Sequence, residues 1–595
     1  MPPLSPAAIP TSSPLSSPRS FVTASASPPN LQYVPSTDLS SLAEVDAGAT
    51  STSGSDSPVR HRKAKRLPPE LREHCRVYLE ENLHQYTLNL LNSLLSARRD
   101  SLRYPAYCPP PSQLSLLNTI IVHPDFTTRP KESNWPEVAV ESLVYLRSIL
   151  TLFGPINAGF KESTRFTSGP AFSRASTPES DNTAENQNDD HRDADERGQV
   201  RLSGKHSDDS IWRRGQDFFT VVGWAFNCSV LYPSRWRYWK QWLDFMLDLL
   251  EKDLEERCRL DNESGQDGMP RLRESILAGY LSQRSGRSAG MAKWIMKAIF
   301  ADGSKSASSL FQEVWYKEHR GMSHNAMNKR KREKVNIEKG EFGGWLDNDS
   351  VYSSQASEPP TPQKRRRNVG KMDRNEFQAL EPTFMDSIPL RQRLFSALSY
   401  LCFHLPDAPL DLTDLYENLE ATIKSLPLPI FTAFVTSSAS ALRVDSQITI
   451  LQGIVELFMP SSALSPAKVD RARHEAGGIS PAILERCFLP YAANTISAED
   501  NAKVSVLLEN LIQIIWCDGS EDFSASLGDA VLKGIDARAA KVKKKKTRGR
   551  GKDEDDSEAE ARAVLEMSGE RLVALADVIA ELSAGDDEIE QDEES

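Results

Sequence analysis

The stretch WKQWLDFMLDLLEKDLEERC, residues Trp239 to Cys258, predicts one long amphipathic helix. Its apolar side chains recur in steps of three and four residues, a spacing that places them on one face of an α-helix. That face consists of Trp239, Trp242, Leu243, Met246, Leu249, Leu250, Leu254 and Cys258. The opposite face consists of Lys240, Asp244, Asp248, Glu251, Lys252 and Glu255. Buried aromatic rings hide roughly 150–250 Å² each, so we predict a central core helix. We expect Ser234 to cap its start.

The same helical spacing recurs along the chain. It predicts one long helix from Leu71 to about Arg99, followed by helices over 114–122, 135–153, 272–281 and 291–300. Five further stripes start near Leu394, Leu412, Ile448, Ile483 and Val504, and Ser497 before the last has the spacing of a capping box. No segment alternates as an exposed strand does. We therefore predict an all-α protein, an irregular α-α superhelix of the HEAT or armadillo kind. Because no fixed repeat period is found, an irregular helical domain is the alternative.

The composition predicts helical blocks separated by long disordered segments. Only 39% of the 595 residues are hydrophobic and 37 are prolines, which is typical of such a mixture. The predicted order is a disordered Ser/Pro-rich tail (1–66), an N-terminal helical block (67–160), a disordered polar insert (161–209), a Trp-rich helical block (210–318), a disordered basic insert (319–372), a C-terminal helical block (373–530) and a basic then acidic tail with a short helix (531–595).

Charge, cysteine spacing and hydropathy limit where in the cell we expect this protein. The net charge of −12 argues against uniform nucleic-acid binding. The seven cysteines have neither zinc-ligand nor redox-pair spacing, which predicts reduced thiols. The N-terminus has no signal pattern, and no apolar run approaches the ~20 residues that span a bilayer. We expect a soluble intracellular protein with no membrane partner.

Three basic clusters lie in segments of disordered composition. They consist of Lys329, Arg330, Lys331 and Arg332; Lys364, Arg365, Arg366 and Arg367; and Lys543, Lys544, Lys545 and Lys546. The run from Arg60 to Arg66 is a candidate fourth cluster. Such clusters are read by import receptors or neutralise nucleic-acid phosphates, and the alternative is a solubilising linker. Together they predict a nuclear protein.

Two clusters adjoin candidate phosphorylation sites. Ser57 and Thr361 each begin a Ser/Thr-Pro-x-Lys/Arg pattern, and a phosphate there would oppose the neighbouring positive charge. Chance matches in a Ser/Pro-rich chain are the alternative. Ser465 and Ser480 also precede prolines, but we assign both to helix capping.

No pattern predicts catalysis, and we expect no enzyme, no cofactor and no metal. Gly286 to Gly290 matches G-x-S-x-G, but that motif needs a strand-to-helix turn, so we predict a loop between helices. The ten histidines are dispersed, and we expect His84 and His404 to be satisfied structural residues.

The sequence therefore predicts a non-enzymatic nuclear scaffold or adaptor, for which chromosome maintenance or ribosome assembly would be typical settings. Its helical blocks would bind protein partners in a nuclear complex, and its basic segments would bind an import receptor with weak nucleic-acid contact. The acidic C-terminus would either hold basic partners or keep the chain soluble. The alternative is a direct DNA- or RNA-binding factor that uses its basic segments.

Overall fold

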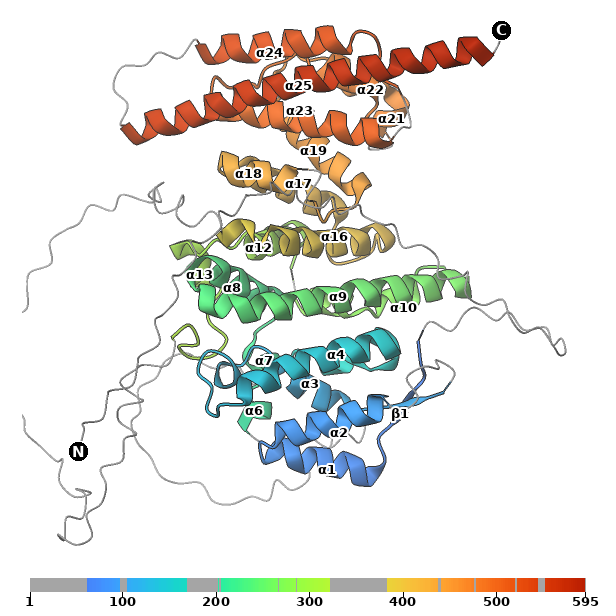
Figure 1. The fold of residues 1–595 in the computed structure, drawn as a ribbon, viewed down its shortest axis with the longest axis vertical. Helices are drawn as coiled ribbons and strands as arrows, with labels where there is room; N and C mark the ends of the chain where they lie inside the picture. Colours follow the sequence, from blue (N-terminus) through green and yellow to red (C-terminus); the bar gives the residue numbers. More distant parts are fainter. Residues whose placement is uncertain are drawn as a thin grey trace, which may run out of the picture. The chain divides into compact units, whose positions relative to one another are not determined.

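The structure, a computed structural model, is mostly helical. It describes residues 61–96, 104–167, 202, 205–265, 267–284, 286–320, 383–436, 440–475, 478–518, 522–543 and 552–593. Helices make up 72% and strands 2% of it, which confirms the all-α class (Figure 1).

The first helical block runs from residue 61 to residue 167. Its elements are β1 (Ala64–Arg66), α1 (Pro69–Glu80), α2 (His84–Ser96), β2 (Ala106–Cys108), α3 (Pro111–Ile120), the 3-10 turn η1 (Pro124–Phe126), α4 (Trp135–Asn157) and α5 (Phe160–Ser163). Helix α4 packs against α2, α3 and, from the next block, α9.

The second block surrounds the tryptophan-rich helix. Its elements are α6 (Lys205–Asp208), α7 (Ile211–Arg214), α8 (Phe218–Leu231), α9 (Pro233–Ser264), α10 (Pro270–Arg273), α11 (Ile276–Ser282), α12 (Ser288–Ile299) and α13 (Lys305–Leu310). Helix α9 contains the whole predicted stretch, and Trp239 and Trp242 are fully buried. The prediction of a central core helix is confirmed, because α9 packs against α4, α8, α10, α11 and α16.

The third block runs from residue 383 to residue 593. Its elements are α16 (Ile388–His404), α17 (Leu412–Lys424), α18 (Leu428–Val435), α19 (Val444–Phe458), α20 (Pro466–Val469), α21 (Arg471–Glu475), α22 (Pro481–Ile483), the π-helical turn η4 (Leu484–Phe488), α23 (Ala498–Asp518), α24 (Leu527–Lys543) and α25 (Lys552–Glu593). Helix α23 packs against α18, α19, α24 and α25.

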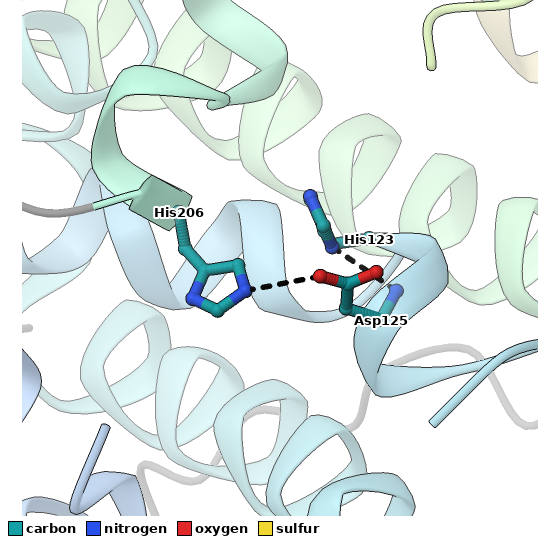
Figure 2. Close-up of side chains that lie close together, drawn as sticks. All are labelled: His123, Asp125 and His206. Carbon is teal, nitrogen blue, oxygen red and sulfur yellow. Dashed lines mark hydrogen bonds and ion pairs between the residues drawn. The ribbon is translucent and has the colours of Figure 1, made fainter. Parts of the chain in front are cut away.

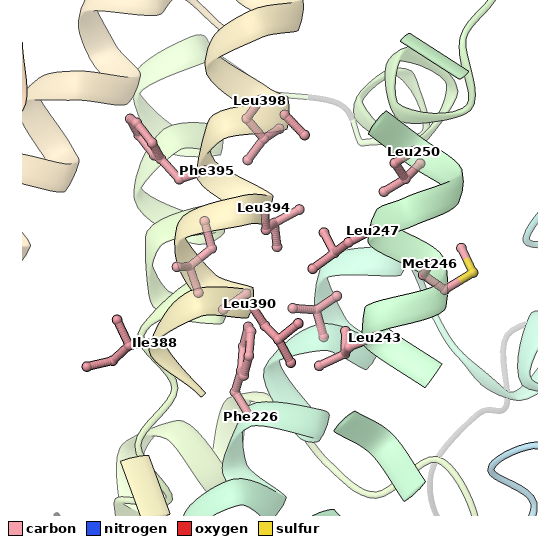
Figure 3. Close-up of a cluster of buried hydrophobic side chains, with 14 of the residues drawn as sticks. Phe226, Leu243, Met246, Leu247, Leu250, Ile388, Leu390, Leu394, Phe395 and Leu398 are labelled. Atoms are coloured by element: carbon pink, nitrogen blue, oxygen red, sulfur yellow. The ribbon is translucent and has the colours of Figure 1, made fainter. Parts of the chain in front are cut away.

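One hydrophobic core joins the second and third blocks. Figure 3 shows Leu243 and Leu247 of α9 facing Leu390 and Leu394 of α16, with Phe226 of α8 beside them. All five side chains are buried. Burying an aliphatic or aromatic side chain contributes about 1.5–3 kcal/mol, so this interface fixes the start of the third block on α9.

The single helix predicted from Leu71 to Arg99 is wrong, because the chain breaks into α1 and α2. Asn82 adopts a left-handed conformation with φ 61°, which asparagine tolerates better than most residues. The N–H of Leu83 donates to the carbonyl of Tyr78 at 2.7 Å. This is a Schellman-type helix end, and the apolar spacing continues across it.

The short parallel pair of β1 and β2 was not predicted. Ala64–Arg66 pairs with Ala106–Cys108, and three residues are too few to show alternation. Arg62 just before it is buried, and its Nε donates to the carbonyl of Tyr104 at 2.8 Å. The composition predicted a disordered tail and a candidate basic cluster here, whereas Arg62 is buried and packs against the segment around Tyr104.

Predicted helix caps have mixed outcomes. Ser234 does not cap α9, because Tyr232 is the N-cap and Pro233 takes the first helical position. Ser465 and Ser480 do stand at N-cap positions before prolines, but neither side chain bonds a backbone N–H of its helix. The capping box is present in half, since the N–H of Asp500 donates to Ser497 Oγ at 3.4 Å, whereas the N–H of Ser497 donates to Thr495 Oγ1 and not to Asp500.

Helix α4 is apolar enough, by length and composition alone, to cross a membrane. We predicted no apolar run of this length from the sequence. In the structure α4 is a core helix, with 56% of its apolar window buried against neighbouring elements. All seven cysteines are free thiols, six of them buried and Cys517 exposed.

Candidate functional site

The strongest candidate binding site is a cavity of about 760 Å³ in the third block. Helices α16, α17 and α19 supply most of its lining, and residues of α21 and α23 complete it. Pockets of roughly 300–1,000 Å³ are the usual size for ligands and short binding segments. The cavity is therefore large enough to receive several side chains of a partner.

Aromatic side chains of α16 form one wall. The rings of Tyr400 and His404 lie 4.5 Å apart between centroids, and those of Phe403 and His404 lie 5.2 Å apart. Phe403 is 69% exposed. A phenylalanine this exposed gains nothing from the folded core, and interfaces are enriched in such aromatic residues.

Polar groups line the other wall. Ser399 Oγ and Tyr416 Oη lie 2.8 Å apart, so these two hydroxyls are hydrogen-bonded to each other. The guanidinium of Arg443 lies 6.0 Å from the Tyr400 ring centroid. Arg443 is exposed and forms no ion pair with any residue that the structure describes. Asp445, two positions further along the chain, is the acidic residue that lines the same cavity.

Electrostatics favour an anionic group in this cavity. Burial first, and the charge of Arg443 second, lower the pKa of His404, so this imidazole is neutral at pH 7. Burial raises the pKa of Tyr400, which keeps its hydroxyl protonated. Arg443 is thus the positively charged group beside the Tyr400 ring, Arg473 also lines the cavity, and a carboxylate is the natural partner of either guanidinium.

The sequence does contain a local signal for this site. The predicted stripe of Leu394, Leu398, Leu401 and Leu405 gives α16 its buried face. Phe403 lies about 160° away from Leu405 on a helix of 3.6 residues per turn, so an aromatic residue stands where a polar one is expected. The position of α17 and α19 opposite that residue depends on tertiary packing.

The predicted import and phosphorylation residues mostly lie outside the described residues. This holds for Ser57, Thr361, Lys329 to Arg332, Lys364 to Arg367 and Lys544 to Lys546. Lys543 is the last residue of α24. The predicted roles of these residues therefore stay predictions.

The G-x-S-x-G match has a structural explanation. Ser288 is the first residue of α12, and its Oγ accepts a hydrogen bond from the N–H of Asp411 at 2.8 Å. Two of the five residues belong to a loop and the rest begin a helix, so the predicted loop between helices is partly right. No strand among the described residues leads into this motif.

The histidines depart from expectation. His84 is buried, yet neither ring nitrogen has a hydrogen-bond partner among the described residues, so the prediction of a satisfied structural histidine is wrong for this part of the chain. His404 lines the cavity instead of the core.

Comparisons with protein-family models, with curated proteins and with solved structures found no match to this chain.

Proposed function

We propose that this protein is a non-enzymatic nuclear scaffold that binds protein partners through its helical blocks. The observation that carries the proposal is the cavity of about 760 Å³ with exposed Phe403 on its wall. Aromatic anchors in pockets dominate the binding energy of protein interfaces. A helical superhelix of the HEAT or armadillo kind is part of the proposal, and contacts between α9 and α16, α17 and α19, and α19 and α23 support it.

The occupant of the cavity is a short partner segment with an apolar side chain next to a carboxylate. The apolar side chain stacks on Phe403 and Tyr400, and the carboxylate pairs with Arg443. A hydrogen bond between ionised groups is roughly twice as strong as a neutral one. A cationic segment would be repelled by Arg443 and could form an ion pair only with Asp445.

Nuclear residence rests on the three basic clusters. Neutralising Lys364, Arg365, Arg366 and Arg367 together should move the protein toward the cytoplasm. Unchanged nuclear retention would mean that another cluster, or a bound partner, provides import. Phosphorylation at Thr361 would act in the same direction as neutralisation.

The test is a tagged purification from nuclease-treated nuclear extract, comparing wild type with Phe403→Ser and Arg443→Glu. The matched control is Tyr316→Ser, because Tyr316 is 75% exposed and does not line the cavity. The proposal expects partners that survive nuclease and are lost from both cavity variants but retained by the control. Identical partner sets from all four proteins would contradict it.

The alternative function, direct DNA or RNA binding, has one structural observation in its favour. A second cavity of about 690 Å³ in the first block is lined by Lys65, Arg66 and Arg72. Lys65 and Arg66 are exposed on β1, and Lys65 lies 5.2 Å from the Tyr107 ring centroid. Basic residues beside an aromatic ring are a common feature of single-strand binding sites.

This alternative predicts steep salt dependence, because each neutralised phosphate releases counterions. Replacing Lys65 and Arg66 with glutamine should weaken binding to an oligonucleotide and reduce the salt slope. Association that is insensitive to salt, or unchanged in this variant, would count against it.

A further inference from the structure

A cluster of ligand-type side chains lies where the first and second blocks meet. His123 and Asp125 flank Pro124 at the turn η1, and His206 belongs to α6. The ligand atoms of the three residues all lie within 4.8 Å of one another. His123 and His206 are buried, and Figure 2 shows the three side chains pointing toward one another.

Hydrogen bonds fix which nitrogen of His123 could bind a metal. The N–H of Asp125 donates to His123 Nδ1 at 3.1 Å, so Nδ1 is the unprotonated nitrogen, and a metal ion bound there would replace this hydrogen bond. His123 Nε2 then carries the proton, and it lies 3.2 Å from Asp209 Oδ2. An imidazole that binds a metal through one nitrogen and donates the other N–H to a carboxylate is the usual arrangement in zinc sites.

We infer that His123 Nδ1, the Asp125 carboxylate and His206 Nε2 bind one zinc ion, with Asp209 orienting His123. Two imidazoles and a carboxylate are a ligand set that zinc accepts, and imidazole suits zinc better than it suits magnesium or calcium. Ligand atoms around tetrahedral zinc lie roughly 3.3 Å apart, and His206 Nε2 already lies 3.4 Å from Asp125 Oδ2.

His84 is an independent sign that something is to be bound here. Its ring centroid lies 6.1 Å from that of His206, its side chain is 1% exposed, and neither nitrogen has a partner in the structure. A buried polar group without a partner destabilises the folded chain.

Two lysines compete with zinc for Asp125. Lys131 Nζ forms an ion pair with Asp125 Oδ2, and Lys205 Nζ lies 3.4 Å from the same oxygen. Both lysine side chains are exposed, at 45% and 64%, so they can turn into solvent. Zinc would replace an exposed ion pair with a buried centre that holds α6 on η1.

The test uses the full-length protein, purified without a histidine tag and stripped of metal with a chelator. Titration with zinc against a chromophoric chelator should give one equivalent per chain, and cobalt should give the absorption bands of a tetrahedral site. His206→Gln should remove the binding, and Asp209→Asn should weaken it about tenfold or more. His74→Gln is the matched control, because His74 is an exposed histidine outside the cluster.

A second variant separates a zinc site from a plain ion-pair network. Lys131→Gln with Lys205→Gln should tighten zinc binding about tenfold or more, because two positive charges near the ion are removed. Zinc binding that is absent in the wild type, or equally reduced in His74→Gln, would overturn the inference. If the double lysine variant has unchanged zinc affinity and a lower melting temperature, the cluster is an ion-pair network, and the inference is overturned.

Discussion

Replacing Glu318 with alanine should destabilise the second block more than any surface change. Its carboxylate is fully buried with the Arg235 guanidinium, 3.2 Å away. The indole N–H groups of Trp224 and Trp239 also donate to it, the second at 3.2 Å. Burial raises the pKa of Glu318, and Arg235 opposes that shift.

The magnitude follows from what the substitution leaves behind. Breaking a buried ion pair by removing one partner costs about 3–5 kcal/mol, and an unpaired buried N–H adds about 1–3 kcal/mol. Arg235 keeps two acceptors, Thr127 Oγ1 at 2.9 Å and the carbonyl of Val122. We therefore expect Glu318→Ala to cost about 4–6 kcal/mol.

The assay is urea-induced unfolding followed by tryptophan fluorescence, since Trp224 and Trp239 report directly on this region. Glu318→Gln should cost less than Glu318→Ala, because an amide oxygen still accepts from the indoles. The control is Arg147→Ala, which breaks an exposed pair with Asp244 and should cost less than about 1 kcal/mol. A loss below about 1 kcal/mol for Glu318→Ala would refute the reasoning.

Three further substitutions test other parts of the structure. Gly223→Ala would place a methyl group 2.4 Å from Phe311 Cγ, and a lower melting temperature should report overpacking of about 1–3 kcal/mol; an unchanged melting temperature would show that Phe311 moves freely. Burial, then Glu456, raises the pKa of Glu420 to about 7 from 4.5. The protonated Glu420 side chain is favoured in the folded state, so the free energy of unfolding is highest below pH 4.5 and falls as the pH rises to 7. Glu420→Gln should therefore gain about 1–2 kcal/mol over wild type between pH 4.5 and 8, after allowance for solvent screening; parallel pH profiles in urea unfolding would contradict this. Phe403→Ser should leave stability within about 0.5 kcal/mol, because exposed positions contribute little; a larger loss in the same assay would show that Phe403 packs in the fold.

Local patterns predicted the helices and the core face of α9. The stripe of Trp239, Trp242 and Leu243 works because burial and helical spacing act over a few residues. The cap that Ser497 provides was predictable for the same reason. The end of α1 at Asn82 was missed because the apolar spacing continues through a single left-handed residue.

The candidate sites depend on residues far apart in the chain. Glu318 reaches Arg235 across 83 positions, and His206 reaches Asp125 across 81. No spacing rule connects such pairs, since only tertiary packing brings them together. The sequence did offer His123 and Asp125 two positions apart, but a third ligand on a distant helix leaves no local signal.

The most direct test of the account is photo-crosslinking from the cavity. Benzoylphenylalanine placed at residue 403 in the full-length protein would be crosslinked in nuclear extract, with the same group at residue 316 as the control. If the cavity binds a partner segment, the segment crosslinked from residue 403 should carry an apolar side chain beside a carboxylate. A synthetic peptide of that segment should bind wild type and fail to bind Arg443→Glu. Equal crosslinking from both positions, or a peptide that binds Arg443→Glu as well as wild type, would contradict it.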